Sequence, residues 1–319
     1  MSDQLVPLRL PPVVPGRRIV GYSAVLLPHT DTAEVDWDGF ESLLGRTLGA
    51  GLIPAVNMDT GYGQRLTEAD RTRVLTVAVS LAGAGGFAAG AFVADGEGDA
   101  YDHDAYARAM AEVSEAGGTP VLFPSWGLAA LDEAEWVAAQ ERLGSGVDRF
   151  IAFELGDMFV PYGRIYSLDA YRGLMGIPSC IGAKHSSLSR QAEWARLALR
   201  NEVRSDFSVF TGNDLAIDMV RYGSDYLLGL SAFAPDAFAE RDRRWAAEES
   251  SFDELNDLLQ YLGFFAFRPP VPGYRHDAAM FLKLRGWIDS DATPAGAPQR
   301  PDADREVLAD IAGRLTDVL

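Results

Sequence analysis

Residues 180–230 of the chain read CIGAKHSSLSRQAEWARLALRNEVRSDFSVFTGNDLAIDMVRYGSDYLLGL. In this stretch three short apolar runs, each of a length typical of a buried strand, alternate with two longer segments that have apolar residues at helical spacing. Parallel strands that neighbour each other need connections of this length, so the stretch predicts successive βαβ units. The apolar runs are Cys180–Ala183, Phe207–Thr211 and Tyr226–Leu230, and the helical segments are Gln191–Arg200 and about Asp214–Tyr222.

The same alternation extends towards the N-terminus, where five more apolar runs are each followed by a helical pattern. Eight such units predict an α/β protein, a (β/α)8 TIM barrel. An open doubly wound sheet is the alternative, and the absence of a G-x-G-x-x-G turn after the first run disfavours it. The runs are Ile19–Leu27, Leu52–Asn57, Gly86–Val93, Pro120–Phe123 and Arg149–Leu155, and the helices are Trp37–Ala50, Thr67–Leu81, Asp104–Ala116, Asp132–Leu143 and Leu168–Met175.

The two ends of the chain differ from this pattern. Residues 1–16 contain four prolines and predict an extended arm. Residues 17–235 form the predicted barrel, and residues 236–319 lack strand-like runs and predict a C-terminal helical extension. Its predicted helices are Phe252–Phe264, Ala278–Trp287 and Asp304–Leu319, with a Pro- and Ala-rich linker at Ala292–Pro301.

Composition limits the partners. Of 319 residues 48% are hydrophobic, and 46 acidic residues against 28 basic ones give a net charge of −18. This charge repels nucleic acid and anionic membrane surfaces. We expect no signal peptide and no membrane span, and the single Cys180 favours a reducing, cytoplasmic location. Only Lys184 and Lys283 are lysines, so arginine is the usual cation of this chain.

Lys184 follows the apolar run Cys180–Ala183, at the end of the predicted sixth strand. The chemistry of a TIM barrel lies at the carboxyl ends of its strands. Burial there favours the neutral amine, which attacks a carbonyl to form a Schiff base, whereas arginine stays protonated. Lys184 is therefore the candidate nucleophile, and the alternative is an ion-paired or surface lysine.

The segment IGAKHSSLSR, residues 181–190, resembles the "GxK-x-x-S" motif of the dihydrodipicolinate synthase and N-acetylneuraminate lyase superfamily. The resemblance implies a TIM barrel whose Lys184 forms an imine without a cofactor, in a cytoplasmic homo-oligomer, a tetramer or dimer. Four further segments resemble the family's motifs in the same order. They are YSAVLLPHTDTAEVDWDGF (22–40), DTGYGQRLTEADRTRVL (59–75), FTGNDLAIDMVRYGSDYLLGLSAFAP (210–235) and PGYRHDAAMFLKLRGW (272–287).

The chain departs from the family in its second loop. Where the family has G-T-T-G-E, this chain has Met58-Asp59-Thr60-Gly61-Tyr62, in which Thr60 and Gly61 match. In the family this loop holds the carboxylate of pyruvate or another 2-keto acid. Asp59 places a negative charge there, so the sequence disfavours pyruvate as the substrate.

The fifth strand also departs from the family, because it lacks the proton-shuttling tyrosine of a "YNxP" motif. A carboxylate transfers protons and phenylalanine does not, so Glu154 is the candidate general acid/base, with Asp157 as second choice. The alternative is that Glu154 pairs with an arginine. Tyr62 or Tyr162 is a less favoured replacement phenol.

The predicted function is a class I lyase or aldolase that cleaves or condenses a polyhydroxylated keto compound, a keto acid or keto sugar, through Lys184. The alternatives are an imine-based sugar-acid dehydratase, a metal-dependent isomerase or lyase that uses strand-end residues, and a non-catalytic sugar-acid binder. His185 follows Lys184, so its side chain should point the opposite way. The predicted substrate-binding residues are Asp59, Thr60, Gly61, Trp126, Gly212, Asp214 and Ser231, and the residues of the metal alternative are His29, Asp59, Glu154 and Asp214.

Overall fold

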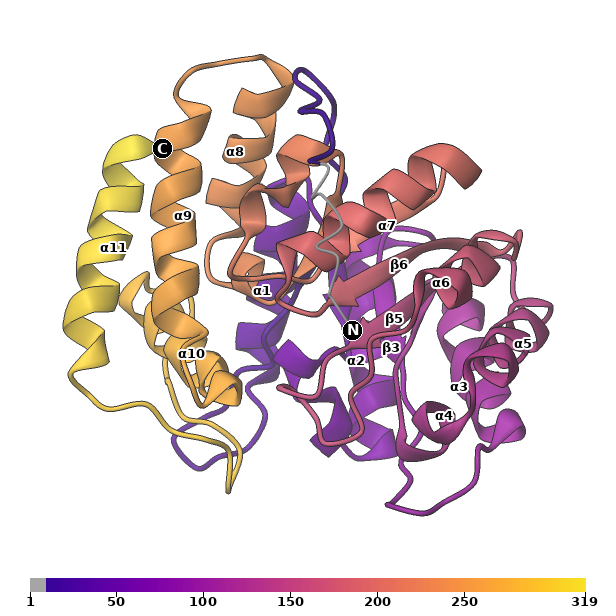
Figure 1. Ribbon diagram of the computed structural model, residues 1–319. Helices are drawn as coiled ribbons and strands as arrows, with labels where there is room; N and C mark the ends of the chain where they lie inside the picture. The colour runs from indigo at the N-terminus through magenta and orange to yellow at the C-terminus, as the bar shows by residue number, and fades with distance from the viewer. Residues whose placement is uncertain (1–9) are drawn as a thin grey trace, which may run out of the picture.

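The eight apolar runs form eight parallel strands that close into a barrel in chain order. The computed structural model describes residues 10–319 (Figure 1). Pairing of Gly21 with Tyr226 joins the first strand to the last. The predicted (β/α)8 fold is thereby confirmed. The strands are β1 Gly21–Ala24, β2 Ile53–Val56, β3 Ala88–Ala91, β4 Thr119–Leu122, β5 Phe150–Leu155, β6 Cys180–Ser186, β7 Ser208–Thr211 and β8 Asp225–Leu228.

Helices surround the barrel (Figure 1). Many begin where the sequence supplies a capping side chain, as at Thr67 and Asp132, whose side chains accept from backbone N–H groups of the first turn. The barrel helices are α1 Trp37–Gly49, α2 Glu68–Ala82, α3 His103–Glu115, α4 Trp126–Ala130, α5 Glu133–Gly144, α6 Leu168–Met175, α7 Arg190–Val203 and α8 Pro235–Ala246.

The helix predicted over Asp214–Tyr222 is wrong. Only a 3-10 helix, Ile217–Tyr222, forms there. The Asp214 carboxylate accepts from the backbone N–H of Leu230, 2.7 Å away, instead of capping a helix. This contact ties the residues after β7 to the end of β8 and turns Asp214 towards the barrel.

The C-terminal extension contains α9 Phe252–Ala266, α10 Tyr274–Leu284 and α11 Asp304–Val318. These helices pack on one another at one side of the barrel (Figure 1). The predicted helix from Ala278 begins four residues earlier, and this first turn brings Tyr274 and Arg275 to the second loop of the barrel.

The predicted division into an arm, a barrel and an extension stays a prediction. Residues 1–9 of the arm lie outside the described residues, and α8 spans the predicted boundary between 235 and 236. The described part of the arm runs along the barrel, where the Val14 carbonyl accepts from the Trp245 indole at 3.1 Å.

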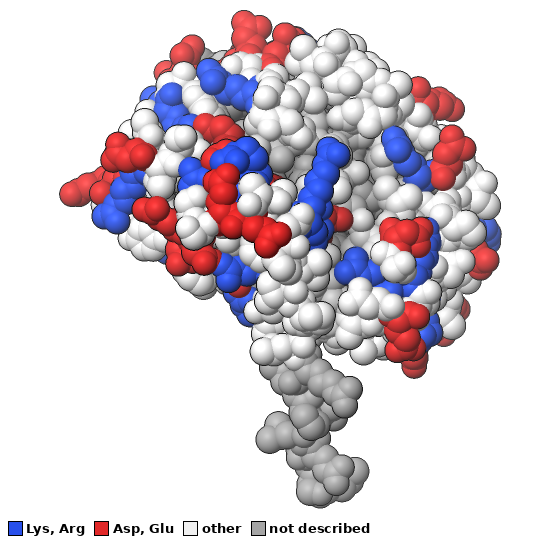
Figure 2. Space-filling view, turned by 90° about the horizontal axis from the view of Figure 1, so that it is seen from above, with Lys and Arg blue, Asp and Glu red and all other residues white. Residues whose placement is uncertain are grey.

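On the face seen in Figure 2, acidic and basic side chains are interspersed. This arrangement differs from the continuous basic surface that nucleic-acid binding requires. None of the helices within residues 10–319 is long and apolar enough to cross a bilayer.

Candidate active site at the carboxyl ends of the strands

The pairing of β5 with β6 decides which side chains enter the barrel. Phe153 is the register partner of Lys184, and Glu154 is the partner of His185. Successive side chains of a strand point to opposite faces, so the first pair faces the interior and the second faces the helices. The Lys184 Nζ lies 4.4 Å from the centre of the Phe153 ring. His185 thus points away from Lys184, as predicted.

Lys184 opens into a small cavity at the mouth of the barrel, whose free volume of about 20 Å³ is enough for about one water molecule. The cavity has an apolar wall and a polar wall, an arrangement typical of a small-molecule site. The apolar side chains are Phe153, Leu155, Phe159 and Phe267; the polar ones are Asp59, Thr60, Lys184, Ser186, Asp214 and Tyr274; and Gly212 and Gly229 complete the lining.

Lys184 is buried, with 9% of its surface exposed. Burial lowers the pKa of its amine to about 8, and the charges of Asp214 and Asp59 oppose part of this shift. The absence of a side chain at Gly212 makes room for Lys184, because a Cβ atom there would lie 2.9 Å from the lysine Cε. Roughly a tenth of an amine with this pKa is neutral at pH 7, far more than for a lysine with the ordinary pKa.

Asp214 faces the same cavity from the end of β7. Burial raises the pKa of this carboxyl to about 7, although the Leu230 N–H and the Lys184 charge oppose the shift. A carboxylic acid with such a pKa both donates and accepts protons near neutral pH. Asp214 was predicted as a substrate-binding residue and as a ligand in the metal alternative, and its position suits proton transfer.

The second loop is held from outside the barrel by α10. The Tyr274 hydroxyl donates to Asp59 Oδ2 at 2.9 Å and lies 2.9 Å from Thr60 Oγ1. Arg275 Nη1 contacts Asp59 Oδ1, also at 2.9 Å, in an ion pair. The charge of Asp59 is thus partly compensated by a residue that lies 216 positions later in the chain.

Glu154 is placed by the structure away from this cavity, between β5 and the outer helices. Its carboxylate accepts from Arg196 Nε and Nη2 at 2.6 and 2.7 Å, from the Tyr166 N–H at 3.0 Å, and contacts His185 Nδ1 at 2.8 Å. Burial would raise its pKa, but the hydrogen bonds and charges of His185 and Arg196 lower it to about 2. The arginine pair is therefore the observed arrangement, and we do not propose Glu154 as the proton-transfer group.

Other predicted site residues are dispersed. Asp157 is exposed in the turn after β5, and Trp126 lies against Tyr162, with 5.2 Å between ring centres. Ser231 is buried and donates to the Leu228 carbonyl at 2.9 Å. Gly61 lies in the second loop close to the Val25 carbonyl, which would be 3.1 Å from a Cβ atom at this position. The predicted residues that meet at the cavity are Lys184, Asp59, Thr60, Gly212 and Asp214.

The metal alternative is not supported by the positions of its residues. Within residues 10–319 no group of three or more His, Cys, Asp or Glu side chains is arranged to hold a metal ion. His29 packs against Tyr62 with 5.4 Å between ring centres, and Glu154 faces the helices.

Two polar side chains of the cavity were not among the predicted site residues. Ser186 lies two positions after Lys184 on the same face of β6, so the strand period could have indicated it. Its buried hydroxyl has no partner among the described residues, and it is free to bind a ligand. Tyr274 carried no such signal, because its position depends on how α10 packs.

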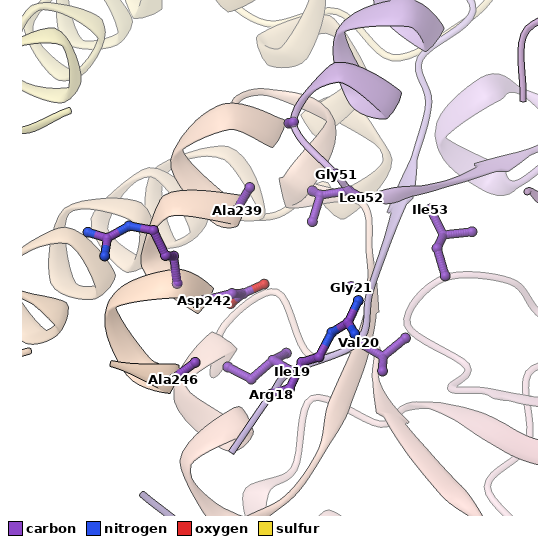
Figure 3. A pocket seen from close by; sticks show the side chains of 12 residues that line it. Arg18, Ile19, Val20, Gly21, Gly51, Leu52, Ile53, Ala239, Asp242 and Ala246 are labelled. Atoms are coloured by element: carbon purple, nitrogen blue, oxygen red, sulfur yellow. The ribbon is translucent and has the colours of Figure 1, made fainter. Parts of the chain in front are cut away.

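A larger cavity, about 250 Å³, lies at the opposite end of the barrel. Figure 3 shows its lining, which includes Ile19–Gly21, Leu52 and Asp242. These strand residues come from the amino ends of β1 and β2, the end that serves stability in TIM barrels. Asp242 already accepts from the Tyr226 hydroxyl at 2.8 Å, so this cavity is not the candidate active site.

No protein-family model and no curated protein matches the sequence. Solved structures do match the fold. Dihydrodipicolinate synthase from Thermotoga maritima has a TM-score of 0.78 and 16% identity, over 95% of this chain and 100% of that chain. The enzyme from Acinetobacter baumannii, complexed with pyruvate, has a TM-score of 0.75 and 17% identity, over 95% of this chain and 100% of that chain. A prophage protein of the same family from Escherichia coli K12, in complex with pyruvate, has a TM-score of 0.74 and 15% identity, over 93% of this chain and 98% of that chain. The resemblance seen in the sequence motifs is confirmed at the level of the fold.

Proposed function

We propose that the protein is a class I lyase or aldolase of the dihydrodipicolinate synthase superfamily in which Lys184 forms a Schiff base with a carbonyl substrate. One observation carries this proposal: a buried lysine, with its pKa lowered to about 8, ends β6 and opens into a cavity. A neutral amine in such a site is a nucleophile for carbonyl carbon. The cytoplasmic location and the homo-oligomer implied by the family remain predictions.

Asp214 is the proposed acid of the reaction. The amine nitrogen of Lys184 attacks the carbonyl carbon, and the adduct becomes a carbinolamine when one proton moves from nitrogen to oxygen. The carbinolamine hydroxyl then takes the proton of Asp214 and leaves as water, and the nitrogen lone pair forms the C=N bond. The iminium cation and the Asp214 carboxylate remain as an ion pair, so charge and atoms balance.

The cavity favours a hydroxylated keto compound. Asp59, Asp214, Thr60 and Ser186 supply oxygen atoms that accept or exchange hydrogen bonds with substrate hydroxyls. The iminium withdraws electrons from the adjacent carbon, and this assists either cleavage of a carbon–carbon bond or loss of a hydroxyl group. Product analysis separates a lyase from a dehydratase, since dehydration keeps the carbon skeleton intact.

Borohydride trapping tests the proposal. The protein is incubated with pyruvate, hydroxyacetone and a series of keto sugars and sugar acids, reduced with sodium borohydride, and digested for mass spectrometry. We expect a covalent adduct on Lys184 with at least one compound, and none in Lys184→Arg, which keeps the charge and removes the nucleophile. Lys283→Arg is the matched control, because Lys283 lies on α10 and pairs with Asp291. Turnover of a substrate without an adduct on Lys184 would overturn the proposal.

A further inference from the structure

We infer that Tyr274, supplied by the C-terminal extension, is the proton-transfer group that moves the proton from nitrogen to oxygen in the Lys184 adduct. The inference rests on the proposed function and extends it to a residue outside the barrel. It would make the extension part of the active site.

Tyr274 is buried and is held in place by close packing against its neighbours. Its ring stacks on Phe267 with 4.3 Å between centres and a tilt of 17°. Its carbon Cε2 would lie 3.2 Å from a Cβ atom at Gly229, so the missing side chain at Gly229 admits the ring. The side chain is 3% exposed and lines the cavity that Lys184 enters. A group held in this way loses little entropy when it meets a substrate.

The Tyr274 hydroxyl already makes two hydrogen bonds, and its oxygen can accept one more. It donates to Asp59 Oδ2, so the Thr60 hydroxyl is the donor in their 2.9 Å contact. A phenol oxygen has two acceptor lone pairs, and one of them remains for a substrate atom in the cavity. Burial raises the pKa of Tyr274 well above its ordinary value, so the phenol is neutral in the resting site.

This network gives a balanced transfer. The phenol oxygen accepts the proton that leaves the adduct nitrogen, while its own proton passes to Asp59. The return of a proton from Asp59 lets Tyr274 protonate the adduct oxygen, and both residues regain their starting states. Asp59 and the missing tyrosine of β5 are the two departures from the family pattern, and the Tyr274–Asp59 hydrogen bond links them.

The test separates the rate of imine formation from its extent. Wild type and Tyr274→Phe are mixed with hydroxyacetone or with pyruvate, quenched with sodium borohydride at increasing times, and the Lys184 adduct is measured by intact mass. Loss of a proton-transfer group slows the approach to equilibrium, whereas loss of a merely structural contact weakens binding. We expect the rate to fall about 10²-fold in Tyr274→Phe, while the final extent stays at the wild-type value.

Tyr222→Phe is the matched control, since Tyr222 is a half-buried phenol that packs on Trp194, with 5.6 Å between ring centres, outside the cavity lining. We expect it to react at the wild-type rate. If Tyr274→Phe does not fold, Thr60→Val removes the barrel-side partner of the phenol and should slow the reaction in the same way.

Three outcomes overturn the inference while leaving the Schiff base intact: an unchanged rate in Tyr274→Phe, a loss of final extent that matches the loss of rate, and a slow Tyr222→Phe. A wild-type protein that forms no Lys184 adduct with either probe or with the wider series would overturn the proposed function and this inference together.

Discussion

Glu154 and Asp214 are both buried carboxyls at the ends of strands, yet they face opposite sides of the barrel wall. Glu154 is enclosed by Arg196, His185 and a backbone N–H, and its pKa is lowered to about 2. Asp214 accepts from one backbone N–H and faces the Lys184 cavity, and burial raises its pKa to about 7. Burial alone therefore does not decide what a carboxyl does, because the number of its partners sets its charge.

The comparison also separates two roles. A carboxylate with a full set of hydrogen-bond donors stabilises the packing of the elements around it. It stays ionised near neutral pH and therefore does not transfer protons. A carboxyl with few partners is close to the point of gaining or losing a proton, which is the property that catalysis uses. The outer face of β5 and β6 is accordingly a structural region, and the inner face is a candidate reactive one.

The largest effect is expected from Glu154→Gln. Removing one partner of a buried ion pair leaves the Arg196 charge uncompensated, which costs about 3–5 kcal/mol of unfolding free energy. Urea denaturation monitored by circular dichroism measures this loss. Asp214→Asn is the matched control and should lose far less, because its carboxyl is only partly charged at pH 7. Equal losses of unfolding free energy in the two variants would contradict the distinction between a structural outer face and a reactive inner face of the barrel.

The free energy of unfolding of the wild type should also fall at acidic pH. The pKa of Glu154 in the fold lies below its ordinary value, so its contribution is present above pH 4.5 and is lost as the pH falls towards 2. Glu154→Gln should show less of this acid-dependent loss, and an unchanged dependence would assign it to other carboxyls.

Asp214→Asn should instead change the reaction. An amide cannot supply the proton that turns the carbinolamine hydroxyl into water, so imine formation should slow about 10²-fold. Time-resolved borohydride trapping with hydroxyacetone measures the rate. Asn213→Ala is a nearby control, because the Asn213 side chain accepts from the Leu215 N–H and does not line the cavity. A wild-type rate in Asp214→Asn would show that the raised pKa has no catalytic use.

The pH dependence gives a finer test of the same face. The reaction needs neutral Lys184, whose fraction falls as the pH drops below about 8, and protonated Asp214, whose fraction falls as the pH rises above about 7. The trapping rate should therefore be bell-shaped, with a maximum between pH 7 and 8 and limbs of about ten-fold per pH unit. Asp214→Asn should lose the decline at high pH and keep the decline at low pH. A monotonic wild-type profile would contradict this pairing.

The fold could be predicted from the sequence because it depends on periodicity, which is local. Strands such as β5 and helices such as α6 begin and end within a residue of their predicted bounds. The position of Lys184 near the end of a buried strand was also predictable, since strand ends and apolar flanks are visible in the sequence. The orientation of Glu154 was not resolved by the prediction, although its position next to Phe153 and the pairing of β5 with β6 contain the answer.

Tyr274 could not be predicted by the same reasoning. It reaches the cavity because α10 starts earlier than its apolar pattern indicates and packs across the second loop. The contact joins residues 59 and 274, which lie 215 positions apart, and no local sequence pattern predicts a contact over that separation. The barrel is thus determined by repeated local patterns, whereas the site also depends on one docking event between the extension and the barrel.

The smallest effect is expected from Asp59→Asn, which tests the charge of the inner face. The variant removes one negative charge from the cavity and leaves Arg275, now 2.9 Å from Asp59 Oδ1, without its carboxylate partner. A partly exposed charge pair contributes about 0.2–1 kcal/mol, so the extent of pyruvate trapping should rise up to about five-fold relative to hydroxyacetone. The ratio of final extents is the proper measurement, because a proton relay through Asp59 would alter the rates with both probes. If the ratio stays at its wild-type value, the charge of Asp59 does not select against a carboxylate, and the sequence-based argument against pyruvate is wrong.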